Sequence, residues 1–301
     1  PRIHVFIATS PIHMEHKLKL TPDRVLETVS EMVRYAKKRC PQIEFSAEDA
    51  MRSDPDFLAE VVRIAIASGA DVINIPDTVG YSTPHEMRTA IERLRAAVPE
   101  CEGIDISVHC HNDLGMATAN TLAGILGGAT QAECTINGLG ERAGNAPLEE
   151  VAMAIRTRPD LYPVETVIDT TQIFMASKVV YGIIGRTVPI NKPIIGTNAF
   201  AHEAGIHQHG VLANRSTYEI MTPQSIGIPD KQMVLGKHSG RHAFEERLRE
   251  LGFTLGKEDF ESCFARFKEL CDKKKDVTDK DIEALVRNRF PEESGQYRLR
   301  N

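Results

Sequence analysis

The sequence of 301 residues lacks the features that mark several classes of protein. Its 36 Lys and Arg residues are outnumbered by 42 Asp and Glu residues, and no basic cluster is interleaved with aromatic residues, which argues against a nucleic-acid partner. No apolar run approaches the roughly 20 residues that cross a bilayer, and no signal peptide is recognised. The six cysteines form no CxxC pair, as expected of reduced thiols. We therefore expect a cytoplasmic protein with neither a nucleic-acid nor a membrane partner.

The first two thirds of the chain alternate short β-branched runs with amphipathic segments, a pattern typical of βαβ units on a parallel sheet. Strands are predicted at Arg2–Ala8, Ile43–Ser46, Asp71–Ile75, Ile104–His109 and Ala132–Ile136. Helices are predicted to begin where a polar residue precedes a proline, at Thr21-Pro22, Asp54-Pro55 and Thr83-Pro84. The strands resemble nearly continuous apolar runs, so we expect a parallel sheet that is buried on both faces and covered by helices.

Polar clusters follow the predicted strands, at the edge where parallel α/β folds gather their chemistry. This favours an α/β fold of the (β/α)8 TIM-barrel type over a doubly wound sheet. No glycine-rich phosphate fingerprint follows the first strand, which argues against dinucleotide binding. The rhythm changes near residue 175, and a charged helical region follows residue 240. We predict a partial barrel as catalytic domain over 1–180 and a C-terminal linker and helical subdomain over 181–301.

The sharpest local pattern is His109-Cys110-His111 at the end of a predicted strand. Side chains at i and i+2 share one face of a strand, so both imidazoles can point to one metal ion. Two nitrogens cannot hold a catalytic divalent ion, and a carboxylate or amide oxygen must join them. The alternative is that both histidines form hydrogen bonds with neighbouring loops.

A second polar cluster, Asn137–Asn145, directly follows the last predicted strand. Its glycines allow a tight backbone, and Glu141, Arg142 and Asn145 lie close enough in sequence to serve one site. The alternative is a glycine-rich turn with polar decoration. Two such clusters on neighbouring strand ends favour the functional interpretation.

Six segments in order along the chain resemble the 2-isopropylmalate synthase family: IEFSAEDAMRSD, INIPDTVGYSTP, VHCHNDLGMATAN, INGLGERAGNAPLEEV, NAFAHEAGIHQHGV and GKHSGRHAF. Homocitrate and citramalate synthases and hydroxymethylglutaryl-CoA lyase are related families that share the barrel and the HxH pattern. The resemblance implies a homodimeric acyltransferase that condenses acetyl-CoA with 2-oxoisovalerate and hydrolyses the thioester, giving 2-isopropylmalate and CoA in leucine biosynthesis.

The resemblance also assigns roles to residues. It implies that His109, His111 and Asn145 hold a divalent ion, which could be zinc, magnesium or manganese. It implies that the oxo-acid pocket is lined by Ser46, Glu48, Thr78 and His4. Glu141 and His207 are implied as the dyad that removes a proton from the acetyl methyl group.

The sequence departs from the family at its start. Family members begin with a strand that ends in Arg-Asp-Gly-Glu-Gln, and the chain contains no such motif. Its first strand resembles the fourth strand of the family, so we expect the first three β/α units and the C-terminal leucine-binding domain to be lacking. Two alternatives stay open: a homologous citramalate or homocitrate synthase, and a non-catalytic fragment that retains only the fold and the dimer surface.

Overall fold

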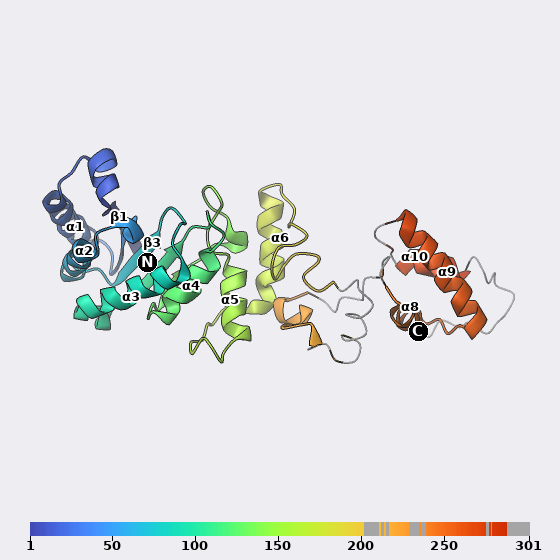
Figure 1. Cartoon of the computed structure of the whole chain (residues 1–301). Coiled ribbons are helices and arrows are strands. Elements are labelled where there is room, and N and C mark those ends of the chain that lie inside the picture. The colour runs from blue at the N-terminus through green and yellow to red at the C-terminus, as the bar shows by residue number, and fades with distance from the viewer. Residues whose placement is uncertain are drawn as a thin grey trace. The chain divides into compact units, whose positions relative to one another are not determined.

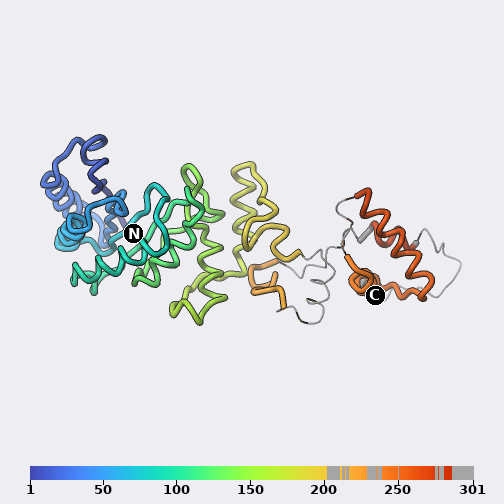
Figure 2. Tube along the Cα trace, viewed as in Figure 1, coloured from blue at the N-terminus to red at the C-terminus, as the bar shows by residue number. Residues whose placement is uncertain are grey.

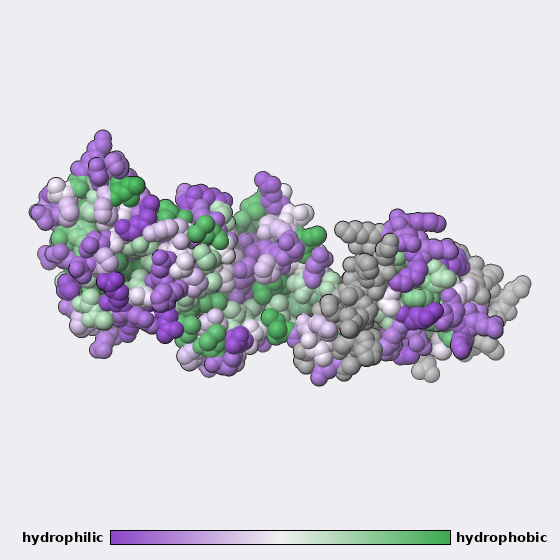
Figure 3. Space-filling model, in the orientation of Figure 1, coloured by the Kyte–Doolittle hydropathy of each residue, from purple (hydrophilic) through white to green (hydrophobic). Residues whose placement is uncertain are grey.

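The computed structural model describes residues 1–201, 211, 214, 217–228, 235, 239–274, 277 and 279–287. The tertiary contacts form two compact units, Pro1–Ile168 and Asp169–Asn301. The first unit holds a parallel β-sheet with helices packed on it (Figures 1 and 2). On the face seen in Figure 3, hydrophilic side chains cover much of this unit and apolar ones are scattered among them. Among the described helices, none has the length and apolar character that crossing a bilayer needs.

The sheet confirms the predicted strands and their parallel pairing. Its strands are β1 (Arg2–Ala8), β2 (Gln42–Glu48), β3 (Val72–Asp77), β4 (Asp105–Cys110) and β5 (Gln131–Glu133). Their spatial order follows the sequence, so every connection leads to the neighbouring strand. The connecting helices are α1 (Pro22–Lys37), α2 (Pro55–Ala67), α3 (Pro84–Ala97) and α4 (Ala117–Leu126), and α5 (Leu148–Thr157) follows β5. The strand ends therefore lie side by side along one edge.

Three helices begin where the polar-residue-then-proline pattern predicts. Thr21, Asp54 and Thr83 cap α1, α2 and α3, and each side chain accepts hydrogen bonds from backbone N–H groups of the first helical turn. Each cap is followed by proline, whose fixed φ suits the first helical position and which has no N–H to leave unpaired. Sequence alone thus places the starts of these helices.

The Thr83 cap allows a direct test. Its side chain accepts from the backbone N–H of Glu86, and the Glu86 carboxylate accepts from the backbone N–H of Thr83 at 2.8 Å. Thr83→Ala is expected to lower the free energy of unfolding by about 1 kcal/mol in urea titrations. The matched variant Thr89→Ala removes the same atoms inside α3 and should not destabilise, because alanine favours helices. Equal stability of the two variants would contradict the capping role.

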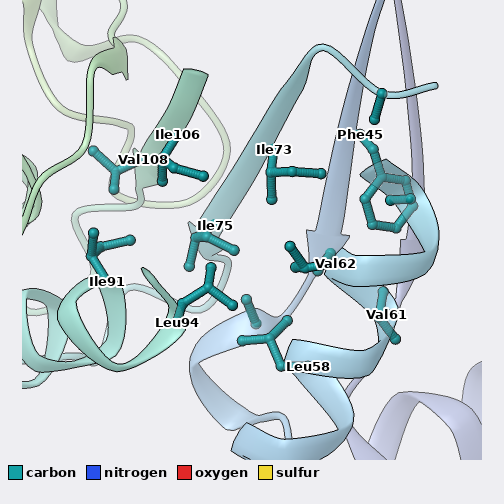
Figure 4. Packing of buried hydrophobic residues seen from close by; sticks show 14 of the residues in the cluster. Phe45, Leu58, Val61, Val62, Ile73, Ile75, Ile91, Leu94, Ile106 and Val108 are labelled. Carbon is teal, nitrogen blue, oxygen red and sulfur yellow. The ribbon is translucent and has the colours of Figure 1, made fainter. Parts of the chain in front are cut away.

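Both faces of β2 and β3 are buried, as expected, but one of these faces carries polar side chains. In β2, Ile43 and Phe45 are buried on one face, while Glu44 and Ser46 lie on the other. The helices form one layer, because α1 to α5 each pack against the next. Figure 4 shows side chains of β2, β3 and β4 meeting those of α2 and α3 on the apolar side. The opposite side, here called the polar face, carries Arg2, His4, Glu44, Ser46, Asn74, Ser107, His109, Gln131 and Glu133.

The polar face is concave. Arg2 of β1 and Gln131 of β5 belong to opposite edges of the sheet, yet the Arg2 Nη1 and Gln131 Oε1 atoms are 2.7 Å apart. Arg2 also donates to Glu44 at 3.0 Å, and Gln131 donates to Ser107 at 3.0 Å. These side chains cross-link four of the five strands and hold the sheet in a curved shape.

In the second unit, the structure describes α6 (Ile173–Ile183), α8 (Arg241–Glu250), α9 (Lys257–Lys273) and α10 (Asp279–Arg287). The last three lie where a charged helical region was predicted. Phe244 of α8 and Phe267 of α9 are fully buried and stack with ring centroids 4.5 Å apart. The division of the chain into the two units falls between Ile168 and Asp169. The proposed domain boundary after residue 180, which falls within α6, stays a prediction.

Candidate functional site

Two histidines at the end of β4 face each other. Their Nε2 atoms are 3.4 Å apart and their ring centroids 5.1 Å apart. His109 and His111 therefore lie on the same side of the strand, as the i, i+2 spacing predicts. Burial lowers the pKa of His111, and the nearby His109 and Arg142 lower it further. At neutral pH His111 is thus an uncharged imidazole, the form that binds metal ions.

Asn145 comes to this site through backbone pairing. It forms an isolated antiparallel bridge with His111, and the Ala146 N–H donates to the Cys110 carbonyl at 3.0 Å. The Asn145 side chain donates to the Leu139 carbonyl at 3.0 Å, while its Oδ1 atom is buried with no hydrogen-bond partner among the described residues. A buried amide oxygen without a partner, on a residue paired through the backbone with His111, suits a divalent ion.

The predicted metal ligands include a side-chain amide besides the two histidines. Among the described residues, no group of three or more His, Cys, Asp and Glu side chains could hold a metal ion. The predicted ligands are two histidines and Asn145. The amide oxygen of Asn145 would supply the third donor, and asparagine is not one of these four residue types. The buried, unpartnered Oδ1 of Asn145 is the observation that makes these residues fit a metal.

Arg142 ties together the loops around the two histidines. Its guanidinium donates to both carboxylate oxygens of Asp113, at 2.8 and 3.0 Å, and to the Thr78 carbonyl at 2.8 Å. This fork joins the loop after β5 to the loops after β3 and β4, and bidentate pairs of this kind fix geometry well. The cluster at 137–145 is therefore a constrained loop.

The predicted pocket residues lie on and beside the polar face. The His4 Nε2 and Ser46 Oγ atoms are 2.6 Å apart, and Asn74 donates to Ser46 at 2.8 Å. Thr78 Oγ1 accepts from the backbone N–H of Asp49 at 2.9 Å, and Glu48 accepts from Lys17. The structure thus connects His4 directly with Ser46. It places Glu48 at the end of β2 and Thr78 directly after β3.

The predicted dyad is described only in part. The Glu141 side chain is 84% exposed, with its carboxylate 3.7 Å from Arg142. His207 lies in the segment 202–210, outside the described residues. The distance between the two groups is therefore not part of the described geometry, and their roles stay predictions.

Sequence reasoning missed two buried or half-buried carboxylates. Asp49 is 1% exposed and accepts hydrogen bonds from Arg52 and His13 at 2.9 Å. Glu133 lies in register with His109 on the neighbouring strand, with its carboxylate 2.6 Å from His109 Nδ1. Burial on its own would raise the pKa of Glu133, but its hydrogen bonds, first that with His109, lower it overall. The available signal was the polar alternation of Gln131 and Glu133 in β5.

Comparison with known proteins supports the resemblance. Residues 1–180 match the HMGL-like family, and residues 194–275 match the homocitrate synthase post-HMGL domain-like family. The 2-isopropylmalate synthase of Ruminiclostridium cellulolyticum is 60% identical over 286 residues, 95% of this chain and 56% of that protein. That of Dictyoglomus turgidum is 56% identical over 301 residues, 100% of this chain and 59% of that protein. The chain thus spans little more than half the length of these relatives.

Solved structures support the fold. The crystal structure of hydroxymethylglutaryl-CoA lyase from Pseudomonas aeruginosa gives a TM-score of 0.54 at 22% identity, covering 62% of this chain and 64% of that one. The enzyme of the same name from Brucella melitensis gives 0.52 at 19% identity, covering 60% and 66%. These similarities and the parallel sheet agree on an α/β fold. Because the HMGL-like match extends over more than half of its residues, the chain belongs to the HMGL-like family.

Proposed function

We propose that the chain is a 2-isopropylmalate synthase polypeptide, an acyltransferase that condenses acetyl-CoA with 2-oxoisovalerate to give 2-isopropylmalate and CoA in leucine biosynthesis. The observation that carries the proposal is the facing pair His109 and His111, with Asn145 bridged to His111 through the backbone and its Oδ1 atom buried without a partner among the described residues. The high identity to 2-isopropylmalate synthases supports it. These three residues would hold a divalent ion, which when bound supplies Lewis-acid polarisation of the 2-oxo carbonyl.

Side chains next to the proposed metal site would bind and orient the oxo acid. Ser46 lies between His4 and Asn74, both within hydrogen-bond distance, so its hydroxyl direction is fixed. Thr78 and Glu48 lie at the same strand ends, where the Thr78 hydroxyl accepts a backbone N–H and Lys17 holds the Glu48 carboxylate. Groups held this firmly suit the orientation of a small substrate.

Glu141 and His207 are the proposed base that takes a proton from the acetyl methyl group. Glu141 belongs to the same short loop as Asn145, and its neighbour Arg142 anchors that loop to Asp113. This placement supports Glu141 as a group near the reacting atoms. For His207 the support is the match to the family motif.

We further infer that the five strands are consecutive parts of an eight-stranded barrel. The hydrogen bond between Arg2 and Gln131 supports this, because it spans the sheet from edge to edge and closure into a barrel needs such curvature. A catalytic domain over 1–180, a helical subdomain over 181–301, homodimerisation and a cytoplasmic location belong to the same proposal.

Thiol release from acetyl-CoA by the purified chain, with added divalent ion, tests the function. We expect the fastest release with 2-oxoisovalerate and none after EDTA treatment. Preference for pyruvate or 2-oxoglutarate would replace the proposal by a citramalate or homocitrate synthase. No release with any oxo acid, from a chain that is folded and holds the metal, would favour the non-catalytic fragment.

A further inference from the structure

Both ring nitrogens of His109 are engaged, on opposite sides. The Nε2 atom faces the Nε2 atom of His111 at 3.4 Å, toward the proposed metal site. The Nδ1 atom faces the Glu133 carboxylate at 2.6 Å. His111 differs, since its Nδ1 atom is buried with no hydrogen-bond partner among the described residues. The two candidate ligands are therefore held in different ways.

The position of Glu133 is set by the sheet. Residues 107–109 of β4 pair in parallel with residues 131–133 of β5, which places Glu133 opposite His109. Neighbouring strands lie about 4.8 Å apart, so the two side chains meet on the polar face without help from a flexible loop. Glu133 and His109 are both partly shielded, with 28% and 25% of their side chains exposed.

The hydrogen bond constrains the proton on the ring. A neutral imidazole carries one N–H and one lone pair, and an ionised carboxylate can only accept. With Glu133 at Nδ1, the proton lies on Nδ1 and the lone pair lies on Nε2, directed toward His111. A metal ion needs that lone pair, and partners of this kind raise the basicity of a ligating histidine.

We infer that Glu133 is a positioning residue that fixes His109 in its Nδ1–H form and aims the Nε2 lone pair into the metal site. The inference rests on the proposed function, because it presupposes that His109 binds the ion. It goes beyond that proposal by making the two histidines unequal: the sheet presets His109, whereas His111 has no such partner among the described residues.

The protonation state of His109 can be measured in the metal-free wild-type chain. Two-bond 15N–1H correlation spectra of histidine-labelled protein in mildly alkaline buffer distinguish the two neutral forms, and His109→Ala assigns the signal. We expect the Nδ1–H form. An Nε2–H ring, or a ring protonated on both nitrogens, would overturn the inference. Because this measurement needs neither metal nor a Glu133 variant, it tests the inference even if the chain binds no ion.

Zinc titration by calorimetry supplies the second measurement. Glu133→Gln keeps the size of the side chain but removes the ionised acceptor, and we expect binding weaker by about 10–100-fold. Glu92→Gln is the charge-matched control, because it removes a carboxylate from the exposed face of α3, where Glu92 accepts from Arg88 at 2.7 Å. Among the described residues, Glu92 has no contact with the polar face, so this variant should leave zinc affinity unchanged.

The outcomes separate the two hypotheses. Absence of zinc binding by the folded wild-type chain, or binding that survives His109→Ala, contradicts the proposed metal site. Binding by wild type with equal affinity in Glu133→Gln contradicts only the role of Glu133. An equal loss in Glu92→Gln would trace the effect to overall charge and would likewise overturn the inference.

Discussion

Replacing His109 or His111 by alanine is expected to weaken binding of a divalent ion by more than about 100-fold, beyond the range usual for loss of an outer-shell partner. The reason is geometric: the two Nε2 atoms, 3.4 Å apart, supply two of the three proposed donors. The ion should then no longer stabilise the fold, a contribution of about 2.7 kcal/mol at a concentration about 100 times Kd. Calorimetric titration and thermal unfolding with and without the ion measure both effects.

His16→Ala is the control for this prediction. His16 lies in the short helical turn His13–Leu18, and its side chain is 69% exposed. Its removal deletes an imidazole without touching the strand ends, so metal affinity should stay at the wild-type value. Should His109→Ala and His111→Ala bind as tightly as His16→Ala, the HxH pattern has no part in metal binding.

Gly144→Ala is expected to disrupt the loop that presents Asn145. Gly144 has φ +91°, and a Cβ atom there would lie 2.0 Å from the Gly138 carbonyl oxygen. That oxygen accepts the backbone N–H of Asn145 at 3.0 Å, so any shift that relieves the clash also displaces the proposed amide ligand. The left-handed backbone alone costs on the order of 1–3 kcal/mol for alanine, and the clash adds to it. Melting temperature and metal affinity should both fall.

Gly115→Ala separates the two causes. Gly115 also has a positive φ, +74°, but no atom lies within 4 Å of the Cβ position. This variant should show the backbone penalty without the loss of metal affinity. If Gly144→Ala were no more damaging than Gly115→Ala, the close approach of Gly144 to Gly138 would not be needed for the site.

Local chemistry made the strands and helix starts predictable. A polar cap followed by proline acts over neighbouring residues, so Thr21, Asp54 and Thr83 mark helix starts in the sequence itself. The end of β5 was less predictable. It was expected at Ile136 but lies at Glu133, and a short helical turn over Ile136–Gly138 follows.

The partners in the site were beyond sequence reasoning because they act over long separations. Glu133 and His109 are 24 residues apart, and His13 and Asp49 are 36 apart. Their contacts depend on strand register, which the apolar pattern alone does not give at this precision. The apolar runs also concealed the alternation of β1 and β2, where one face is polar. The HxH spacing was readable since the two residues are only two positions apart, at the end of one strand.

The loops after β2 and β5 keep three residues other than glycine in the left-handed backbone region: Asp49, Asn137 and Arg142. Glycine would adopt these angles with less strain. For Asp49 and Arg142 the side chain is in use, since Asp49 accepts from His13 and Arg142 holds Asp113. A directed-evolution campaign selecting only for thermal resistance should therefore leave Asp49 unchanged, because loss of the buried carboxylate that holds His13 and Arg52 costs more than the backbone strain that glycine relieves.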